Sequence, residues 1–307
     1  MNKLKFGYYP GCSLEATAKE YDQSVRVVAE MLDVELVELD DWSCCGASSG
    51  HSTNHQLSLA LPARNLALAE RKGLDIAVAC AACFLRFRQT NHEISSSDNL
   101  RQKIEEIIGM PYRSSIEVRH LLDIFVHEVG LEKIERKVEK PLRGLKLASY
   151  YGCYLVRPPE ITQFDDTENP TLMDDLLNSL GAETVNWSHK VECCGGNLML
   201  ARSDIVSKLV GDICQAAIEA GAAAIVTACP LCQANLDMRQ PGSAKIPVLY
   251  FSELMGLAMG AEEKTVRAWF NRHINSPRKI LKSQNQSPPS RARMQKQEDT
   301  SNYRVYG

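Results

Sequence analysis

The sequence lacks any long apolar segment. No stretch of its 307 residues approaches the roughly eighteen uninterrupted apolar residues that indicate a membrane-spanning helix. Its first residues, Met1 to Phe6, also lack the apolar core and the cleavage site of a secretion signal. We therefore expect a protein with no membrane span and a cytoplasmic location.

The sequence also lacks the motifs that bind nucleotide cofactors. Neither a P-loop nor a Gly-x-Gly-x-x-Gly motif is present. The formal net charge of −3 gives no reason to expect a nucleic acid as a partner. If the protein has a redox function, its electrons must therefore come from a neighbouring subunit.

Cysteine, by contrast, is abundant and regularly placed. Ten of the eleven cysteines fall into two sets with the same order: a single cysteine, an adjacent pair and a Cys-x-x-Cys. The first set is Cys12, Cys44, Cys45, Cys80 and Cys83, and the second is Cys153, Cys193, Cys194, Cys229 and Cys232. In both sets 34 residues separate the adjacent pair from the Cys-x-x-Cys. In a reducing compartment such spacing favours metal ligands or redox thiols over structural disulfides.

Five thiols per set exceed what a single tetrahedral zinc ion or a cubane iron-sulfur cluster needs. Adjacent cysteines suit a cluster in which they bind different irons, and glycines such as Gly46 and Gly195 let the backbone approach it. Iron-sulfur ligation is therefore the favoured interpretation. The alternatives are structural zinc, a thioredoxin-type redox pair at Cys229 and Cys232, and buried cysteines without a metal. Cys214 lies outside both sets and is predicted to be a core residue.

The duplication extends beyond the cysteines. Residues 6–14 match 147–155, and residues 42–46 match 191–195. The offset is 141 residues at the first cysteine and 149 at the others, which places a loop insertion at about 158–170 in the second half. Two similar units predict pseudo-twofold symmetry rather than an extended repeat array.

Each half alternates short apolar runs with segments of helical periodicity. The predicted strands cover 4–9, 34–39, 76–79, 145–150, 184–187 and 224–227, and the predicted helices cover 15–32, 57–71, 172–180 and 204–220. This alternation predicts an α/β fold in which each domain is a mostly parallel sheet with flanking helices. Gly73 and Gly181 stand where helix C-terminal glycines are expected. The cysteines then follow the carboxyl ends of strands, where open α/β sheets bind their ligands.

We predict three segments: a first domain over residues 1–140, a second over 141–274, and a basic, flexible tail over 275–307. Residues 278–307 carry seven Lys or Arg against Glu298 and Asp299, with few apolar residues. The tail is either a solvated extension or an arm that orders against an acidic partner subunit.

These motifs together resemble those of a known family. The matching features are Pro10-Gly11-Cys12, Cys44-Cys45-Gly46, Cys80-x-x-Cys83, Tyr151-Gly152-Cys153, Arg157-Pro158, Cys193-Cys194-Gly195 and Cys229-Pro-Leu-Cys232. Over about residues 5–260 the chain resembles the B subunit of heterodisulfide reductase, which has two cysteine-rich CCG domains. The tail lies outside the resemblance.

The resemblance implies two pseudo-symmetric CCG domains, in which each set of five cysteines binds a noncubane 4Fe-4S cluster. It also implies that the two clusters face one cavity and reduce a small-molecule disulfide to two thiols. Electrons would arrive from the ferredoxin-like C subunit of such a complex, itself supplied by the flavin-containing A subunit.

Residues beside the motifs are candidates for the proton and substrate chemistry. His51, His189 and Lys190 stand near the Cys-Cys pairs and are candidate catalytic proton donors or charge partners. Arg157 and Arg86 follow cysteines and are candidate substrate-binding residues, because arginine holds anionic groups well. For all five, an ordinary surface position is the alternative.

Three functional hypotheses follow. The first is the iron-sulfur catalytic subunit of a heterodisulfide reductase-type complex, a thiol-disulfide oxidoreductase. The second is an electron-relay subunit of another CCG-containing redox complex, in sulfur or organic-acid oxidation, without disulfide chemistry. The third is a zinc-binding structural or assembly module. Iron and sulfide analysis separates the third from the other two.

Overall fold

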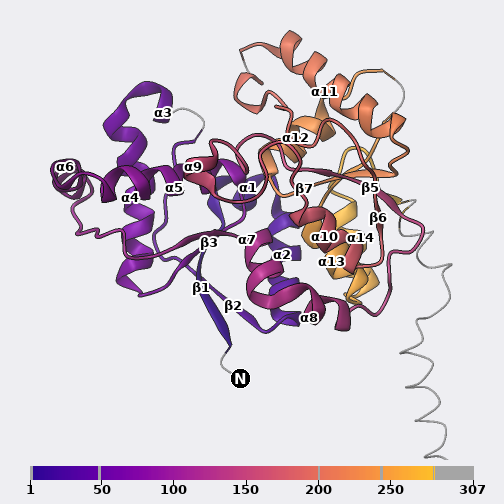
Figure 1. Cartoon of the computed structure of the whole chain (residues 1–307), viewed down its shortest axis with the longest axis horizontal. Helices are drawn as coiled ribbons and strands as arrows, with labels where there is room; N and C mark the ends of the chain where they lie inside the picture. Colours follow the sequence, from indigo (N-terminus) through magenta and orange to yellow (C-terminus); the bar gives the residue numbers. More distant parts are fainter. Residues whose placement is uncertain (1–2, 48–49, 200, 243–244, 279, 281–307) are drawn as a thin grey trace, which may run out of the picture.

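Two parallel sheets of the same topology organise the chain (Figure 1). The computed structural model describes residues 3–47, 50–199, 201–242, 245–278 and 280. The strands of the first sheet are β1 Leu4–Tyr9, β2 Val34–Glu38, β3 Ile76–Val78 and β4 Val118–His120, in the order β2-β1-β3-β4. Those of the second are β5 Lys146–Tyr150, β6 Glu183–Thr184, β7 Ala224–Thr227 and β8 Val248–Tyr250, in the order β6-β5-β7-β8. The predicted α/β fold with parallel sheets and pseudo-symmetry is confirmed.

Helices connect the strands, because parallel neighbours require a crossover between them. In the first half they are α1 Gly11–Ala16, α2 Lys19–Met31, α3 Gly50–Thr53, α4 His55–Arg71, α5 Ala81–Ser95, α6 Asp98–Ile108, α7 Leu121–Asp123, the π-helix Ile124–Gly130 and α8 Leu131–Arg136. In the second half they are α9 Pro159–Thr162, α10 Leu172–Ser179, the 3-10 helix Gly196–Leu198, α11 Ser203–Glu219, α12 Pro230–Met238, α13 Phe251–Ala258 and α14 Glu263–Phe270.

Most predicted elements are present, with several differences. The strand predicted over 184–187 is the shorter β6, Glu183–Thr184, and helices α6, α13 and α14 are not predicted by the sequence. The helix predicted over 15–32 is split into α1 and α2, because the N–H groups of Thr17 and Ala18 both donate to Ser13 O and close the first helix there. The fourth strands, β4 and β8, are three residues long and are not predicted by the sequence. Gly73 and Gly181 have φ values of 64° and 86° just after α4 and α10, as helix-ending glycines do.

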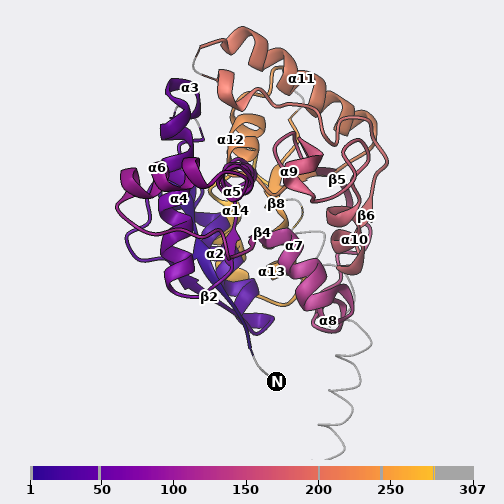
Figure 2. The same ribbon diagram turned by 60° about the vertical axis from the view of Figure 1, so that its left-hand side comes forward.

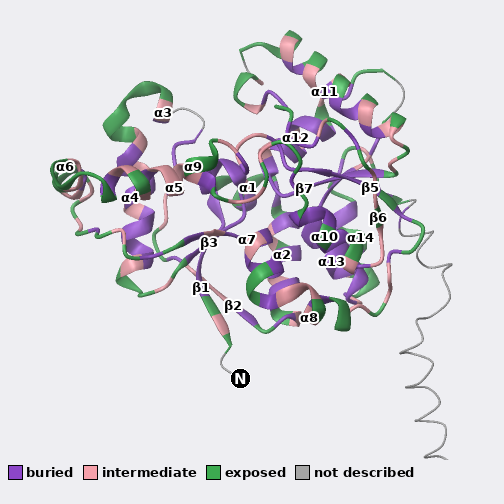
Figure 3. Ribbon diagram, in the orientation of Figure 1, coloured by how far each residue is buried: buried purple, intermediate pink, exposed green. Residues whose placement is uncertain are grey.

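The two halves exchange helix contacts across their junction (Figures 1 and 2). Helix α2 of the first half packs on α13 and α14 of the second, and α10 of the second packs on α7 and α8 of the first. A buried hydrogen bond of 2.6 Å joins the hydroxyls of Ser24 and Ser252 across this junction. The buried apolar residues form one continuous core, and exposed residues lie on outer elements such as α3 and α11 (Figure 3). Cys214 on α11 is 3% exposed, which confirms its predicted core position.

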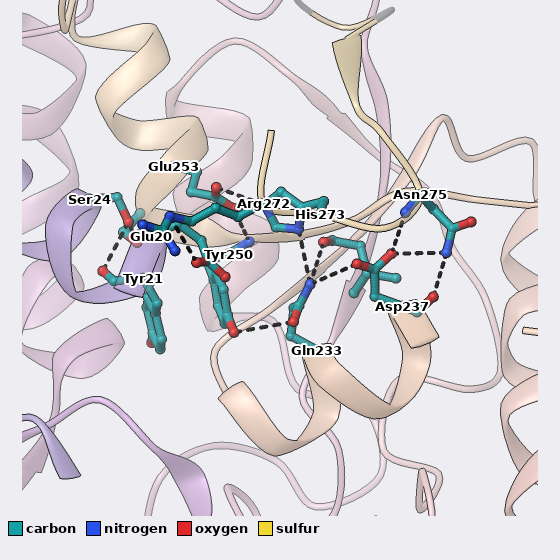
Figure 4. Close-up of polar contacts among 12 residues, drawn as sticks. Glu20, Tyr21, Ser24, Gln233, Asp237, Tyr250, Glu253, Arg272, His273 and Asn275 are labelled. Atoms are coloured by element: carbon teal, nitrogen blue, oxygen red, sulfur yellow. Dashed lines mark hydrogen bonds and ion pairs between the residues drawn. The ribbon is translucent and has the colours of Figure 1, made fainter. Parts of the chain in front are cut away.

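A buried polar network fixes residues 273–275 to helices α12 and α13 of the second half (Figure 4). His273 Nε2 lies 2.8 Å from Glu253 Oε1, and His273 Nδ1 lies 3.0 Å from Gln233 Nε2. Asp237 accepts hydrogen bonds from the N–H groups of residues 274 and 275. Because Gln233 and Asp237 belong to α12, the network also holds the helix that carries Cys232. Most of the predicted tail over 275–307 lies outside the described residues.

Within the part of the chain that the structure describes, no helix has both the length and the apolar character that a membrane span requires.

Candidate metal centres

Three adjacent strands in each sheet deliver one set of cysteines to the same edge. In the first sheet Cys12 follows β1, the Cys44-Cys45 pair follows β2, and Cys80 follows β3. The second sheet repeats this arrangement, with Cys153 after β5, the Cys193-Cys194 pair after β6, and Cys229 after β7. Since β1 and β5 are the central partners of these strands, the spacing in sequence becomes proximity at the carboxyl edge.

The second cysteine of each adjacent pair meets the last cysteine of its Cys-x-x-Cys. Cys45 Sγ lies 3.0 Å from Cys83 Sγ, and Cys194 Sγ lies 3.7 Å from Cys232 Sγ. All four of these cysteines are buried, whereas Cys44 and Cys193, the first members of the pairs, are exposed. Each site therefore has an inner pair of thiols and an outer side that faces solvent.

The two sites also meet each other. The neighbouring thiols of Cys232 and then Cys80 hold the pKa of Cys229 well below its usual range, and the nearby Cys229 raises the pKa of Cys80. The thiols of Cys80 and Cys229 thus lie close to each other, although they follow strands of different sheets. Across the described ranges, the His, Cys, Asp and Glu side chains form no group of three that would hold a single metal ion.

A buried tyrosine supports each Cys-Cys loop from behind. The Tyr9 hydroxyl donates to Ser43 O at 2.9 Å, and the Tyr150 hydroxyl donates to Glu192 O at 2.6 Å. Each acceptor directly precedes the adjacent cysteine pair. Burial, and secondarily the neighbouring cysteines, raise the pKa of both tyrosines, which therefore remain neutral donors. The matched segments of the repeat contain both tyrosines, but their sequence gives no sign of what their hydroxyls bind.

Backbone N–H groups point at sulfur in both sites. The Gly46 N–H donates to Cys44 Sγ at 3.4 Å, and the Gly195 N–H donates to Cys193 Sγ at 3.3 Å. Both glycines have positive φ values, 73° and 74°, which favour glycine. A hydrogen bond from Cys153, and to a lesser extent the Gly195 N–H, lower the pKa of Cys193 to about 6. The outer thiol of the second site is therefore readily present as a thiolate, the form that binds metal.

All five cysteines of the second set line one cavity of about 100 Å³. Its other walls are mostly apolar and include Tyr151, Tyr154, Leu198, Leu209 and Leu231. A Cβ atom on Gly152 would lie 3.1 Å from Cys232 Sγ, so glycine is needed to leave the sulfur its space. Soft thiolates, backbone N–H donors and apolar walls are what an iron-sulfur cluster requires, and the residues present fit such a group.

A second, outer cavity adjoins the first. It has a volume of about 480 Å³, and Cys153 and Tyr154 line both cavities. Its remaining walls are formed by Leu85, Arg157, Pro158, Pro159, Thr167 and Glu168. Most of these residues belong to the predicted insertion over 158–170, so the extra loop of the second half builds this cavity.

The two candidate arginines lie near this outer cavity. Arg157 lines it and donates from Nη2 to Glu168 Oε1 at 2.7 Å. The Arg86 guanidinium lies 6.0 Å from the ring centre of Tyr154, and its Nη1 donates to Gln89 Oε1 at 3.1 Å. The structure therefore brings both arginines close to the wall that the two cavities share.

The candidate proton donors have different surroundings. Lys190 is buried, and its Nζ contacts Asp174 Oδ1 at 3.2 Å and Pro170 O at 3.0 Å. His189 is exposed in part and stacks on Trp187. His51 is half-buried, and among the described residues its buried Nδ1 has no hydrogen-bond partner. The structure does not bring these three residues together.

Lys190 is nevertheless linked to the second cavity. Its partner Asp174 accepts a hydrogen bond from the Tyr151 hydroxyl at 2.7 Å, and Tyr151 lines that cavity. Burial raises the pKa of Asp174. Asp174 and Tyr151 are residues that sequence reasoning missed, because nothing in a lone Asp on a helix indicates a buried Lys partner.

The fold and the duplicated cysteine turns define a protein with two cysteine-rich domains. A family model described as the CCG cysteine-rich domain matches residues 6–88 and 147–237. The chain therefore belongs to the CCG cysteine-rich family that includes the B subunit of heterodisulfide reductase, as an iron-sulfur redox protein.

The chain is also similar to individual proteins whose names differ. The 8-methylmenaquinol:fumarate reductase membrane anchor subunit of Wolinella succinogenes is 34% identical over 85% of this chain and 94% of its own length. The B subunit of ferredoxin:CoB-CoM heterodisulfide reductase of Methanosarcina mazei is 30% identical over 85% and 90%. A protein of Archaeoglobus profundus, named as similar to the B subunit of heterodisulfide reductase, is 31% identical over 86% and 93%.

The fold also has a counterpart among solved structures. The crystal structure of a hypothetical protein from Helicobacter pylori superposes with a TM-score of 0.69 at 12% identity, and the match covers 90% of this chain and 53% of that one. At this identity the match concerns the fold alone.

Proposed function

We propose that this chain is the catalytic iron-sulfur subunit of a heterodisulfide reductase-type complex, which reduces a disulfide to two thiols at two noncubane 4Fe-4S clusters. The proposed ligands are the ten cysteines of the two sets, and the proposed domains are residues 1–140 and 141–274. The observations that carry the proposal are that the Cys80 and Cys229 thiols lie close together, and that Cys229 lines the inner cavity, which adjoins an outer cavity of about 480 Å³.

The reaction joins one disulfide, two electrons and two protons to give two thiols. Bound clusters would supply the electrons singly, so two adjacent centres can deliver both without release of a thiyl radical. The chain supplies the surroundings of the reaction. The apolar walls of the inner cavity exclude water, which strengthens the electrostatic interactions inside it.

Substrate binding is proposed for the outer cavity. Its walls include Leu85, Pro158 and Pro159, which suit the apolar part of a ligand. Arg157 would bind an anionic group of the substrate after exchange of its exposed partner Glu168, and Arg86 would assist from the side of Tyr154.

Proton supply is proposed for the groups that the sequence singles out. Lys190 would act through Asp174, whose hydrogen-bond donor Tyr151 lines the inner cavity. His189 and His51 would serve from the more accessible side of each Cys-Cys loop. If Asp174 has this role, Asp174→Asn should impair the reaction. The exposed Asp204→Asn removes the same charge elsewhere and should not.

The proposed partners are a ferredoxin-like C subunit and a flavin-containing A subunit, with a cytoplasmic location. The missing nucleotide-binding motifs support this arrangement, because electrons must then reach the chain from another protein. The relative from Methanosarcina mazei has ferredoxin in its own name.

A second candidate function is electron relay without disulfide chemistry. The relative of Wolinella succinogenes, at 34% identity, is named as part of a fumarate reductase, which favours this alternative. In that case the clusters would pass electrons between neighbouring proteins of a complex, and the outer cavity would not hold a disulfide.

One anaerobic experiment separates the two candidates. Purified protein should contain about eight irons and eight acid-labile sulfides per chain. After reduction, addition of a heterodisulfide should reoxidise the centres and release two thiols per disulfide consumed. Full iron content without thiol release from any disulfide would favour the relay, and a protein without iron would contradict both.

A further inference from the structure

One histidine contacts the backbone of both Cys-x-x-Cys turns. His120 ends β4, and its side chain is fully buried between the two halves. Its Nε2 lies 3.2 Å from Ala79 O and 3.2 Å from Ala228 O. These carbonyl groups directly precede Cys80 and Cys229, the two cysteines whose thiols lie close together.

The hydrogen bonds of the ring determine where its proton lies. The N–H of Leu122 donates to His120 Nδ1 at 3.1 Å, so Nδ1 is the acceptor and the ring proton is on Nε2. That single N–H is shared between the two carbonyl oxygens as a bifurcated hydrogen bond. Burial lowers the pKa of His120 to about 4, which keeps the ring neutral at physiological pH.

The surroundings of the ring allow little movement. The rings of Phe84 and Phe164 contact it edge to face, each at a centroid distance of 5.9 Å. The first comes from the helix that follows Cys80, and the second comes from the insertion of the second half. The imidazole is therefore held between aromatic side chains from both halves of the chain.

The second half uses a different residue at the equivalent position. His120 pairs with Val78 and Tyr250 pairs with Thr227, so Tyr250 is the counterpart of His120. Tyr250 stacks on Tyr21 at a centroid distance of 4.1 Å, and the two rings lie beside each other in Figure 4. The Tyr21 hydroxyl donates to Ala228 O at 3.3 Å. Tyr21 belongs to α2, so Ala228 O accepts from two side chains of the first half, but within the described residues only His120 contacts both carbonyl groups.

We propose that His120 is a positioning residue that fixes the distance between the two metal centres through the carbonyl groups of Ala79 and Ala228. The inference rests on the proposed function, because it assumes a cluster in each set. Two centres that exchange electrons with one substrate must keep a constant separation, and a displacement of about 1 Å can cost about a hundredfold in rate.

The test compares three variants of the full-length protein with the wild type, all purified anaerobically. His120→Phe keeps the size and aromatic packing of the side chain but removes the donor. His120→Gln keeps an amide N–H near the position of Nε2, and His127→Phe changes an exposed histidine of the adjoining π-helix as the control. The measurements are iron content, the magnetic interaction between the two reduced centres by electron paramagnetic resonance, and the rate of disulfide reduction.

We expect His120→Phe to retain iron but to lose the magnetic interaction, with a fall in rate of about tenfold to a hundredfold. His120→Gln should restore both, and His127→Phe should match the wild type. An unchanged interaction in iron-replete His120→Phe, or a His120→Gln variant as impaired as His120→Phe, would overturn the proposal.

A further variant covers the case in which His120→Phe does not fold. The amide of His120→Asn is one bond too short to reach both carbonyl groups, so it should weaken the interaction, and a wild-type spectrum there would also overturn the proposal. Wild-type centres that interact but release no thiol from a disulfide would contradict the proposed reaction and leave the result on His120 intact.

Discussion

The Cys80 thiol lies close to the Cys229 thiol, its counterpart in the other half of the chain. Each thiol belongs to a separate five-cysteine set at the carboxyl edge of a separate sheet. This proximity links two sites that the sequence presents as independent copies, and the proposed function therefore treats them as one reaction centre.

Cys194→Ser should remove one cluster and leave the other. Cys194 is a buried member of the inner pair of the second site, 3.7 Å from Cys232 Sγ. The iron content should fall from about eight to about four per chain, because a hydroxyl is a poor ligand for iron-sulfur centres. Cys214→Ala is the control, since Cys214 lies in the core outside both sets, and its iron content should not change. An equal loss in both variants would mean that iron binding depends only on stability.

Tyr150→Phe should loosen the second Cys-Cys loop without unfolding the protein. The variant leaves Glu192 O without its donor, which should lower the free energy of unfolding by about 1 to 3 kcal/mol. Thermal unfolding with and without iron would measure the effect. Tyr9→Phe should have a similar effect at the first site, because the Tyr9 hydroxyl makes the equivalent bond to Ser43 O. A loss confined to one half would contradict the equivalence of the two sites.

Arg157→Gln should weaken substrate binding when the substrate carries an anionic group. Loss of a charge-assisted hydrogen bond of about 1.5 to 3 kcal/mol corresponds to a fall of about tenfold to a hundredfold in kcat/KM. Glu168→Gln should act in the opposite direction and lower KM, since it frees the guanidinium that Glu168 now binds. Steady-state kinetics with an anionic and a neutral disulfide would separate charge from shape. Identical losses for both substrates would argue against a charge contact.

The stability of the second half should decrease at alkaline pH. The Glu253 carboxylate offsets the effect of burial and raises the pKa of His273 to about 9. The contribution of the His273–Glu253 pair to the free energy of unfolding is therefore fully present below the unfolded pKa of about 6.5. It is at most about 3 kcal/mol, and it is lost as the pH rises through about 9. Glu20, Asp237 and the Tyr250 ring also face this group, and they remain in place in His273→Gln. Unfolding measured from about pH 6 to about pH 10 should show the decrease in the wild type and a flatter profile in His273→Gln.

The sequence predicts the frame of the molecule well, because its signals are local. Strand β1 lies at Leu4–Tyr9 as predicted, and the cysteines gather where strands end because parallel neighbours share an edge. What could not be predicted depends on how the halves pack. The contact of Cys80 with Cys229, and the position of His120 between two carbonyl groups, arise only when the sheets come together. The burial of Lys190 against Asp174 is likewise a tertiary feature without a sequence signal.

The most direct test of a joint reaction centre is a redox titration with substrate. Anaerobic protein, reduced by two electrons per chain, is mixed with one equivalent of a heterodisulfide while both cluster signals are followed. The account predicts that the two centres lose one electron each in the same step, with two thiols released. Oxidation of a single centre, or of both without release of thiol, would contradict it.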